Sequence, residues 1–139
     1  MTGMVRDTQT FGIVKYMNYK GEQIELVDSS QVTAGVTCEV YKFTNSEKKD
    51  LGKVFVKAGH KTPKQKVLQG EKTIESFEKG QGTLTIISSS GAQTEYLFPG
   101  DAESVDVKIG ETMQWEAYED LVFNEICWPP YQDGRFENL

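Results

Sequence analysis

The sequence predicts an all-β protein built as a double-stranded jelly-roll barrel, and three observations support this fold class. Short alternating or β-branched runs dominate the chain, and nearly all of them end at Gly, Pro, Asn, Asp or Ser. No long stretch has the i, i+3, i+4, i+7 apolar spacing of an amphipathic helix. A chain of 139 residues can bury one core without disulfides, so many short antiparallel strands indicate a sandwich or barrel.

The expected strands follow one another along the whole chain. They cover residues 12–17, 23–27, 36–43, 53–57, 64–68, 73–77, 83–87, 94–98, 105–109, 112–117 and 121–128. We expect one structural domain overall. In it, residues 1–50 supply N-terminal strands that complete the barrel or swap onto a neighbouring copy, and residues 51–139 form the core and the tail. The tail "PPYQDGRFENL" contains two prolines and a glycine, which predicts an extended coil across the outside or over a barrel mouth.

Composition and charge exclude several classes of function. The formal net charge of −6 repels phosphate backbones, so nucleic acid is not an expected partner. No run is long and apolar enough for a membrane helix, and the first twelve residues lack the pattern of a secretory signal. Cys38 and Cys127 match no metal-binding spacing and are expected to be free thiols in a cytoplasmic protein.

Glycine spacing in the middle of the chain carries a family resemblance. Gly59, Lys64, Lys66, Glu71 and Gly80 follow one another at nearly the spacing of a Gly, His-x-His, Glu, Gly motif. Compared with that motif, this chain has one residue fewer between Gly59 and the first pair, and two more between Glu71 and Gly80.

A second motif lies further along. "VKIGETMQWEA" contains a turn glycine at Gly110, with Met113 where the motif has a histidine, and "EICWPP" ends like a last barrel strand. From residue 51 to residue 130 the chain therefore resembles the cupin superfamily, small jelly-roll barrels that include metal-dependent dioxygenases, sugar isomerases and dTDP-sugar epimerases.

The resemblance does not extend to the metal site that it implies. A cupin metal centre uses three histidines and one glutamate, and this chain contains a single histidine, His60, in a turn before the first motif strand. Lys64, Lys66 and Met113 stand in the histidine positions, and an ammonium group has no lone pair to offer a metal. We expect no bound metal and no other cofactor.

The two lysines suggest a different kind of site. Residues 64 and 66 point to the same face of a strand, so a barrel-facing pair would form a positively charged floor for a carboxylate or phosphate ligand. Glu71, Glu75 and Glu125 could instead neutralise the pair. The alternative is a register shifted by one residue, with both lysines in water and Gln65 and Val67 turned inward.

Alternation in the last two strands indicates which side chains share a face. Met113 and Trp115 share one, and Phe123, Glu125 and Cys127 share another. Trp115 and Trp128 suit stacking on a sugar, although tryptophan also fills cores and dimer interfaces. A buried Glu125 would have the raised pKa of a general acid or base, whereas pairing with a lysine would keep it charged and structural.

These residues define the candidate site. The predicted ligand-binding residues are Lys64, Lys66, Glu71, Glu75, Met113, Trp115, Glu125 and Cys127, and the predicted catalytic residues are Glu125, Lys66 and Tyr41. The resemblance implies, for sugar epimerases, a histidine base supported by an aspartate. No aspartate is adjacent to His60 in sequence, so that pair does not carry over.

Three hypotheses about function follow. The first is a metal-free cupin that binds a small anionic or sugar-like ligand, with isomerase, epimerase or lyase-like proton transfer if it is an enzyme. The second is a non-catalytic binding or scaffold barrel that works through dimer surfaces and its tail. The third is a metal-dependent oxygenase or isomerase with atypical ligands. A homodimer is expected in each case, because the N-terminal strands need a sheet to join.

Overall fold

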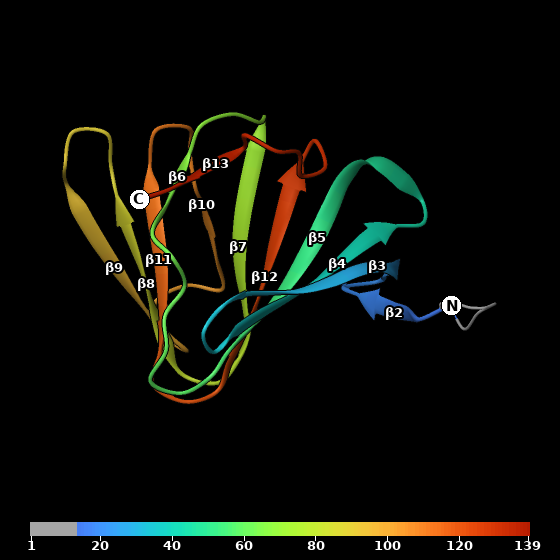
Figure 1. Cartoon of the computed structure of the whole chain (residues 1–139), viewed down its shortest axis with the longest axis horizontal. Helices are drawn as coiled ribbons and strands as arrows, with labels where there is room; N and C mark the ends of the chain where they lie inside the picture. Colours follow the sequence, from blue (N-terminus) through green and yellow to red (C-terminus); the bar gives the residue numbers. More distant parts are fainter. Residues whose placement is uncertain (1–13) are drawn as a thin grey trace.

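The protein consists of two antiparallel β-sheets that face each other. The computed structural model describes residues 14–139, and within them every regular element is a strand (Figure 1). Because this part of the chain contains no helix, it contains none that could cross a membrane. The predicted all-β fold class is confirmed.

The larger sheet has seven strands. Their spatial order is β10 (Ser104–Asp106), β7 (Lys72–Lys79), β12 (Leu121–Trp128), β5 (Ser46–Val56), β4 (Val36–Phe43), β3 (Glu22–Thr33) and β2 (Tyr16–Tyr19). β2, β3 and β4 therefore join the sheet through β5, at the end of the strand order opposite to β10 (Figure 1).

The smaller sheet has five strands and forms the opposite wall. Its order is β13 (Phe136–Asn138), β6 (Gln65–Val67), β11 (Thr112–Ala117), β8 (Gly82–Ile87) and β9 (Gln93–Phe98). The chain crosses between the sheets repeatedly, as in a jelly roll.

Most expected strands are found near their predicted positions. β4, β11 and β12 have the predicted bounds, whereas β3 and β5 extend well beyond them. The first expected strand, 12–17, begins outside the described residues, as does the segment examined for a secretory signal. The tail, predicted as an extended coil, contains a short strand instead, because β13 pairs with β6 through Phe136↔Val67 and Asn138↔Gln65.

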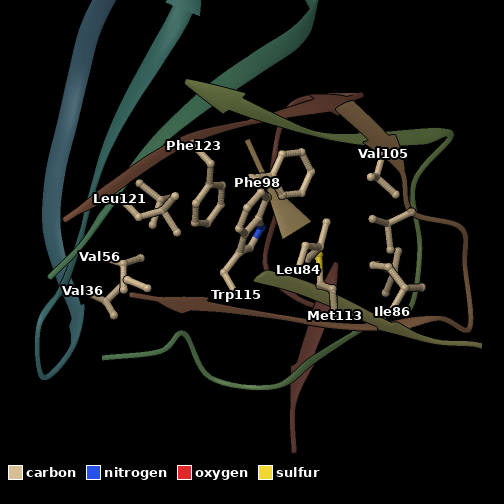
Figure 2. Packing of buried hydrophobic residues seen from close by; sticks show 14 residues of the cluster. Val36, Val56, Leu84, Ile86, Phe98, Val105, Met113, Trp115, Leu121 and Phe123 are labelled. Carbon is tan, nitrogen blue, oxygen red and sulfur yellow. The ribbon is translucent and has the colours of Figure 1, made fainter. Parts of the chain in front are cut away.

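The main core fills part of the space between the two sheets. Trp115 stacks on Phe123 with ring centroids 4.3 Å apart, and Phe98 lies 5.1 Å from Trp115 on the other side (Figure 2). Leu84 and Met113 are buried beside this aromatic group. A dense aromatic centre fixes the distance between the two sheets.

A second core lies on the opposite face of the seven-stranded sheet. Tyr41, Phe43, Leu51 and Ile126 are all buried there, together with Ile24. On β12 and β5 these residues alternate with those that face the smaller sheet, as the two-residue period of a strand requires.

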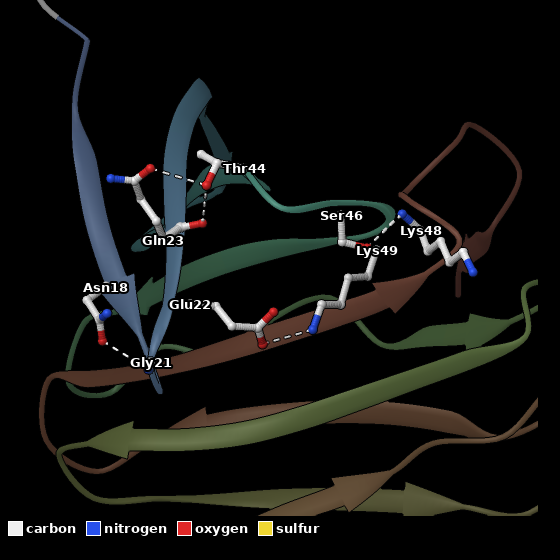
Figure 3. Close-up of polar contacts among 8 residues, drawn as sticks. All are labelled: Asn18, Gly21, Glu22, Gln23, Thr44, Ser46, Lys48 and Lys49. Carbon is white, nitrogen blue, oxygen red and sulfur yellow. Dashed lines mark hydrogen bonds and ion pairs between the residues drawn. The ribbon is translucent and has the colours of Figure 1, made fainter.

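Polar contacts tie the N-terminal strands to this second core. Glu22 of β3 forms an ion pair of 2.9 Å with Lys49 of β5, and the hydroxyl of Thr44 donates to the backbone oxygen of Gln23 (Figure 3). The Lys49 ammonium also lies 4.3 Å from the ring centroid of Phe43. The strands that precede the cupin-like core thus pack against the barrel of their own chain.

Candidate functional site

A cavity of about 620 Å³ remains between the two sheets. Its polar wall includes Asp28, Asp50, Gln65, Glu75, Glu125 and Asn138, and its apolar wall includes Val36, Val54, Met113, Trp115, Phe123 and Phe136. The volume is in the range of small-molecule sites. Among residues 14–139, four carboxylic acids line this cavity and no lysine, arginine or histidine does.

Three of the four acids lie in one row across the seven-stranded sheet. The register places Asp28 opposite Val40, Val40 opposite Gly52, Gly52 opposite Glu125, and Glu125 opposite Glu75. Side chains of directly paired residues point to the same face, so all of them face the cavity.

Gly52 keeps the middle of this row open. A Cβ atom at this position would meet the Cys38 sulfur at 3.3 Å, so a side chain here would crowd the cavity floor. The glycine therefore leaves space between Asp28 on one side and the two glutamates on the other.

Glu75 and Glu125 form a carboxyl pair at the inner end of the row. Glu75 is only 1% exposed, and its Oε1 accepts a hydrogen bond of 2.8 Å from Trp115 Nε1. Its Oε2 is buried and accepts no hydrogen bond from an N–H or hydroxyl group of the described residues. Oε2 can be satisfied by a proton shared with the Glu125 carboxyl, by a water molecule in the cavity or by a ligand.

Burial raises the pKa of both carboxyls, and a neighbouring acid adds to the rise in each, Glu125 for Glu75 and Asp50 for Glu125. For Glu75, burial is the main cause, followed by the charge of Glu125 and the hydrogen bond with it, and these outweigh the opposing bond from Trp115. Burial also raises the pKa of Glu125, although the hydrogen bond with Glu75 and the positive charge of Arg135 oppose this. Two interacting carboxyls of this kind titrate as a pair and retain a proton to a higher pH than an isolated glutamic acid does.

Arg135 is the cation that acts on this pair, yet it lies outside the cavity wall. Its side chain is buried, and it donates hydrogen bonds to the backbone oxygens of Pro129, Lys72 and Trp128 at 3.0, 2.7 and 3.2 Å. Gly70 makes room for it, because a Cβ there would come within 2.5 Å of the guanidinium. Arg135 therefore anchors the tail to the barrel end and stabilises the carboxyls only from a distance.

Asp50 completes the acidic lining near the tail. Its Oδ2 accepts a hydrogen bond of 3.0 Å from the backbone N–H of Tyr131. Burial raises the pKa of Asp50, and the Tyr131 bond and the charge of Arg135 only partly offset this.

The two cysteines are free, and both line the cavity. Burial, together with the nearby carboxylates, raises the pKa of Cys38 to about 12 and that of Cys127 still further. Both groups are therefore neutral thiols near pH 7, which makes them poor nucleophiles and poor metal ligands.

The structure brings five of the predicted site residues to the cavity wall: Glu75, Met113, Trp115, Glu125 and Cys127. The predicted faces of β11 and β12 agree with this, since Phe123 lines the cavity as well and Ile126 belongs to the second core. Their role in binding stays a prediction.

The predicted orientation of the two lysines is wrong. Lys64 is exposed and Lys66 is half-buried, and neither lines the cavity, whereas Gln65 does and Val67 is buried in the core. The register shifted by one residue, which the sequence left open, is the observed one. The anionic ligand expected from these lysines loses its structural basis.

Two further predicted residues lie away from the cavity. Glu71 is exposed in the turn before β7. Tyr41 is fully buried in the second core, where its hydroxyl donates to Glu39 Oε1 at 2.7 Å. Neither side chain can exchange a proton with a ligand in the cavity, and Lys66 as a catalytic residue is excluded from it on the same ground.

The arrangement of residues does not fit the metal centre that the cupin resemblance implies. No group of three or more His, Cys, Asp or Glu side chains within residues 14–139 is placed to hold a metal ion. His60 is exposed in its turn, and its ring packs against Gly35, where a Cβ would meet it at 2.4 Å.

Sequence reasoning missed Asp28, Asp50 and Cys38, which also line the cavity. Alternation within β4 and β5 could have found Cys38 and Asp50, because they share faces with Val36 and Gly52. Asp28 could not be found in this way, because a register shift between Leu26 and Asp28 reverses the alternation of β3.

Comparison with solved structures identifies the fold. The structure of oxalate decarboxylase from Bacillus subtilis at pH 4.6 superposes with a TM-score of 0.60 at 19% identity, covering 83% of this chain and 29% of that one. A formate complex of the Lactobacillus farciminis oxalate decarboxylase gives 0.60 at 12% identity, covering 91% and 33%.

The chain has the cupin fold. It spans about a third or less of the length of these oxalate decarboxylase chains. No protein-family model matches the sequence, and no curated protein matches it. At this level of identity the likeness concerns the fold alone, and the cavity must be interpreted from its own residues.

Proposed function

We propose that this cupin binds a small, sugar-like molecule in the cavity between its sheets without the help of a metal. The observation that carries the proposal is the cavity itself, with the ring of Phe136 on the wall of the smaller sheet and the carboxyl row on the wall of the larger sheet. An aromatic face opposite several hydrogen-bonding groups is the common design of sites for polyhydroxylated ligands.

The charges on the cavity wall indicate which charge the ligand should carry. Among the described residues the wall carries acids only, and the nearby Arg135 is engaged with backbone oxygens. A carboxylate or phosphate would meet like charges in a partly desolvated space, which is strongly unfavourable. We therefore favour an uncharged or positively charged sugar-like ligand over an anionic one.

A second candidate function, proton transfer on the bound ligand, is favoured by the Glu75–Glu125 pair. A carboxyl pair with a raised pKa keeps a proton at a higher pH than an ordinary carboxyl, so it can donate or accept that proton. Glu125, which is partly accessible from the cavity, would exchange the proton with the ligand, and Glu75 would hold it in place. Such an activity would be of the isomerase or lyase type.

A ligand screen tests the binding function directly. We expect uncharged sugars, polyols or their amino derivatives to raise the melting temperature and to change Trp115 fluorescence, and dicarboxylates to have no effect. Val40→Phe, which places a large ring inside the cavity, should abolish these responses. Thr37→Phe, on the exposed opposite face of the same strand, is the matched control and should leave them intact.

The opposite results would support the alternatives. If no compound binds and the purified protein is a dimer in solution, the non-catalytic scaffold hypothesis is preferred. Stoichiometric metal in the purified protein would contradict the metal-free proposal.

A further inference from the structure

We infer that the ligand of this cavity carries a protonated amine, and that the ammonium group replaces the proton shared by Glu75 and Glu125. This inference rests on the proposed function and names the chemical class of its ligand.

Acidic residues are in excess around Glu75 and Glu125. From β5, Asp50 faces the same space, and from β3, Asp28 stands at the far end of the row across Gly52. β4 contributes the neutral thiol of Cys38, β12 that of Cys127, and β11 the indole of Trp115. A positive charge placed here is attracted from several sides at once.

The nearby cations are engaged elsewhere. The two terminal nitrogens of Arg135 donate to three backbone oxygens and to Thr73 Oγ1, and only its buried Nε has no acceptor among the described residues. Lys42, which is opposite Asp50 in the β4–β5 register, lies 3.6 Å from Glu25. Lys53 projects from the opposite face of the sheet and bonds to Glu78. Within residues 14–139, no side-chain cation enters the cavity to neutralise its carboxyls.

The Oε2 atom of Glu75 is buried. When both carboxyls of the pair are ionised, this atom has no hydrogen-bond donor among the described residues. Such an atom costs about 1–3 kcal/mol or more if it stays unsatisfied. A primary ammonium has three N–H donors, so it can bond to Glu75 Oε2 and to Glu125 together.

Aromatic rings form part of the cavity wall. Trp115 and Phe123 are buried and stack on each other, and Phe98 lies on the other side of Trp115, so the rings open to the cavity are those of Phe136 and Tyr131. The faces of such rings attract alkylammonium groups in addition to their apolar contacts. Acids on one side and aromatic faces on the other suit a ligand that is both cationic and partly apolar.

The exchange conserves charge and protons. The free protein holds one proton on the pair, the ligand arrives as R–NH3⁺, and binding releases one proton to solvent while the ammonium keeps its own. Binding must therefore strengthen as pH rises through the raised pKa values of the pair, up to the pKa of the amine itself.

A matched pair of probes tests the inference: D-glucamine and D-sorbitol, which differ by one ammonium group in place of one hydroxyl. We expect glucamine to bind at least about tenfold more tightly than sorbitol at pH 7.5, which corresponds to one favourable ion pair of about 1.4 kcal/mol. Calorimetry in two buffers of different ionisation enthalpy should show that glucamine releases about one proton at a pH where the free pair is still protonated, and that sorbitol releases none.

Variants on β12 and on its neighbour β7 test whether the carboxyl pair causes the tighter binding of glucamine and the proton release. Glu125→Gln should weaken glucamine binding about tenfold and abolish proton release, with little change for sorbitol. Glu78→Gln, on the opposite face of β7, is the control and should change neither. If Glu125→Gln does not fold, the proton release measured when glucamine binds to the unmodified protein still tests the inference.

The outcomes separate this inference from the proposed function. Equal binding of both probes without proton release would overturn the ammonium inference and leave the cavity as a site for uncharged ligands. Binding of other sugars but not glucamine would have the same meaning. If neither probe nor any compound of the wider screen binds, the proposed function itself is overturned.

Discussion

Two glutamates on one strand have opposite surroundings. Glu75 faces the cavity and meets another carboxyl, whereas Glu78, on the opposite face of β7, bonds to Lys53 and accepts a hydrogen bond of 3.0 Å from Asn124. Burial raises the pKa of Glu78, but the bonds and charges of its partners outweigh this effect and hold its pKa below the ordinary value. The pKa of Glu75 is instead raised well above it.

The contrast distinguishes Glu78, a carboxylate with a cation as its partner, from Glu75, a carboxyl whose charged neighbour is another acid. The outer face has a packed core and a neutralised acid, so it serves stability. The inner face keeps an open volume and a carboxyl pair that no cation of residues 14–139 neutralises from within the cavity, an arrangement that is costly for stability and typical of functional sites. The predictions below separate the two faces by their effects on the free energy of unfolding.

The largest expected effect concerns packing on the outer face. Leu51→Ala should lower the free energy of unfolding by about 2–5 kcal/mol, because Leu51 is fully buried in the second core. Val40→Ala, on the cavity side of the neighbouring strand, should cost less than about 1 kcal/mol, since Val40 already borders open space. Urea unfolding of both variants measures the difference, and equal losses would mean that the cavity is filled.

The next effect concerns the buried cation near the pair. Arg135→Met should lower the free energy of unfolding by about 2–3 kcal/mol, because it removes the hydrogen bonds that Arg135 donates to the backbone oxygens of Pro129 and Lys72 and to Thr73 Oγ1. It should also raise the pKa of Glu125 further, because the charge of Arg135 opposes that rise. A Glu125 pKa that does not move in this variant would show that Arg135 acts on the tail alone.

The carboxyl pair predicts a specific dependence of stability on pH. The folded pKa of Glu75 exceeds its unfolded value, so its contribution favours the folded state below about pH 4 and is lost as pH rises through the raised pKa. Glu75→Gln should remove this decline, up to about 1.4 kcal/mol per pH unit. Unfolding curves between pH 4 and 8 compare the variant with the original chain; parallel curves would contradict a raised pKa.

The smallest expected effect is the loss of the outer ion pair. Lys53→Met should cost about 0.5–1 kcal/mol at neutral pH, because the Glu78 carboxylate is partly exposed and screened by water. The pKa of Glu78 is lowered in the folded state, so this contribution exists above its unfolded pKa and disappears as pH falls through the folded one. A difference from the original chain that persists at pH 2 would show that packing, rather than charge, accounts for it.

Much of the fold follows from the sequence because its strands alternate clearly. In β11 and β12 the alternation gives the correct face for Trp115, Glu125 and Ile126. In β6 the same rule favours Val67 as the inward residue. The motif spacing favoured Lys64 and Lys66 as the inward residues instead. A match that rests on the spacing of glycines can be wrong by one residue, and a shift of one residue reverses the two faces of a strand.

The rest of the site depends on features that single strands do not encode. The row from Asp28 to Glu75 needs the pairing of five strands, including a register shift in β3. Tyr41 suits a catalytic acid by residue type, yet its strand turns it into the second core. The tail strand β13 is short and contains Glu137 and Asn138, so its pairing with β6 has no clear local signal.

The central claim is that Glu75 and Glu125 hold a proton in the free protein. Nuclear magnetic resonance titration of the carboxyl carbons, in protein labelled with 13C-glutamate and assigned with the Gln variants, measures it directly. We predict that Glu75 and Glu125 titrate above the ordinary glutamic acid value and that Glu78 titrates below it. If all three carboxyls ionise together near pH 4, the two faces of the sheet do not differ and the account is contradicted.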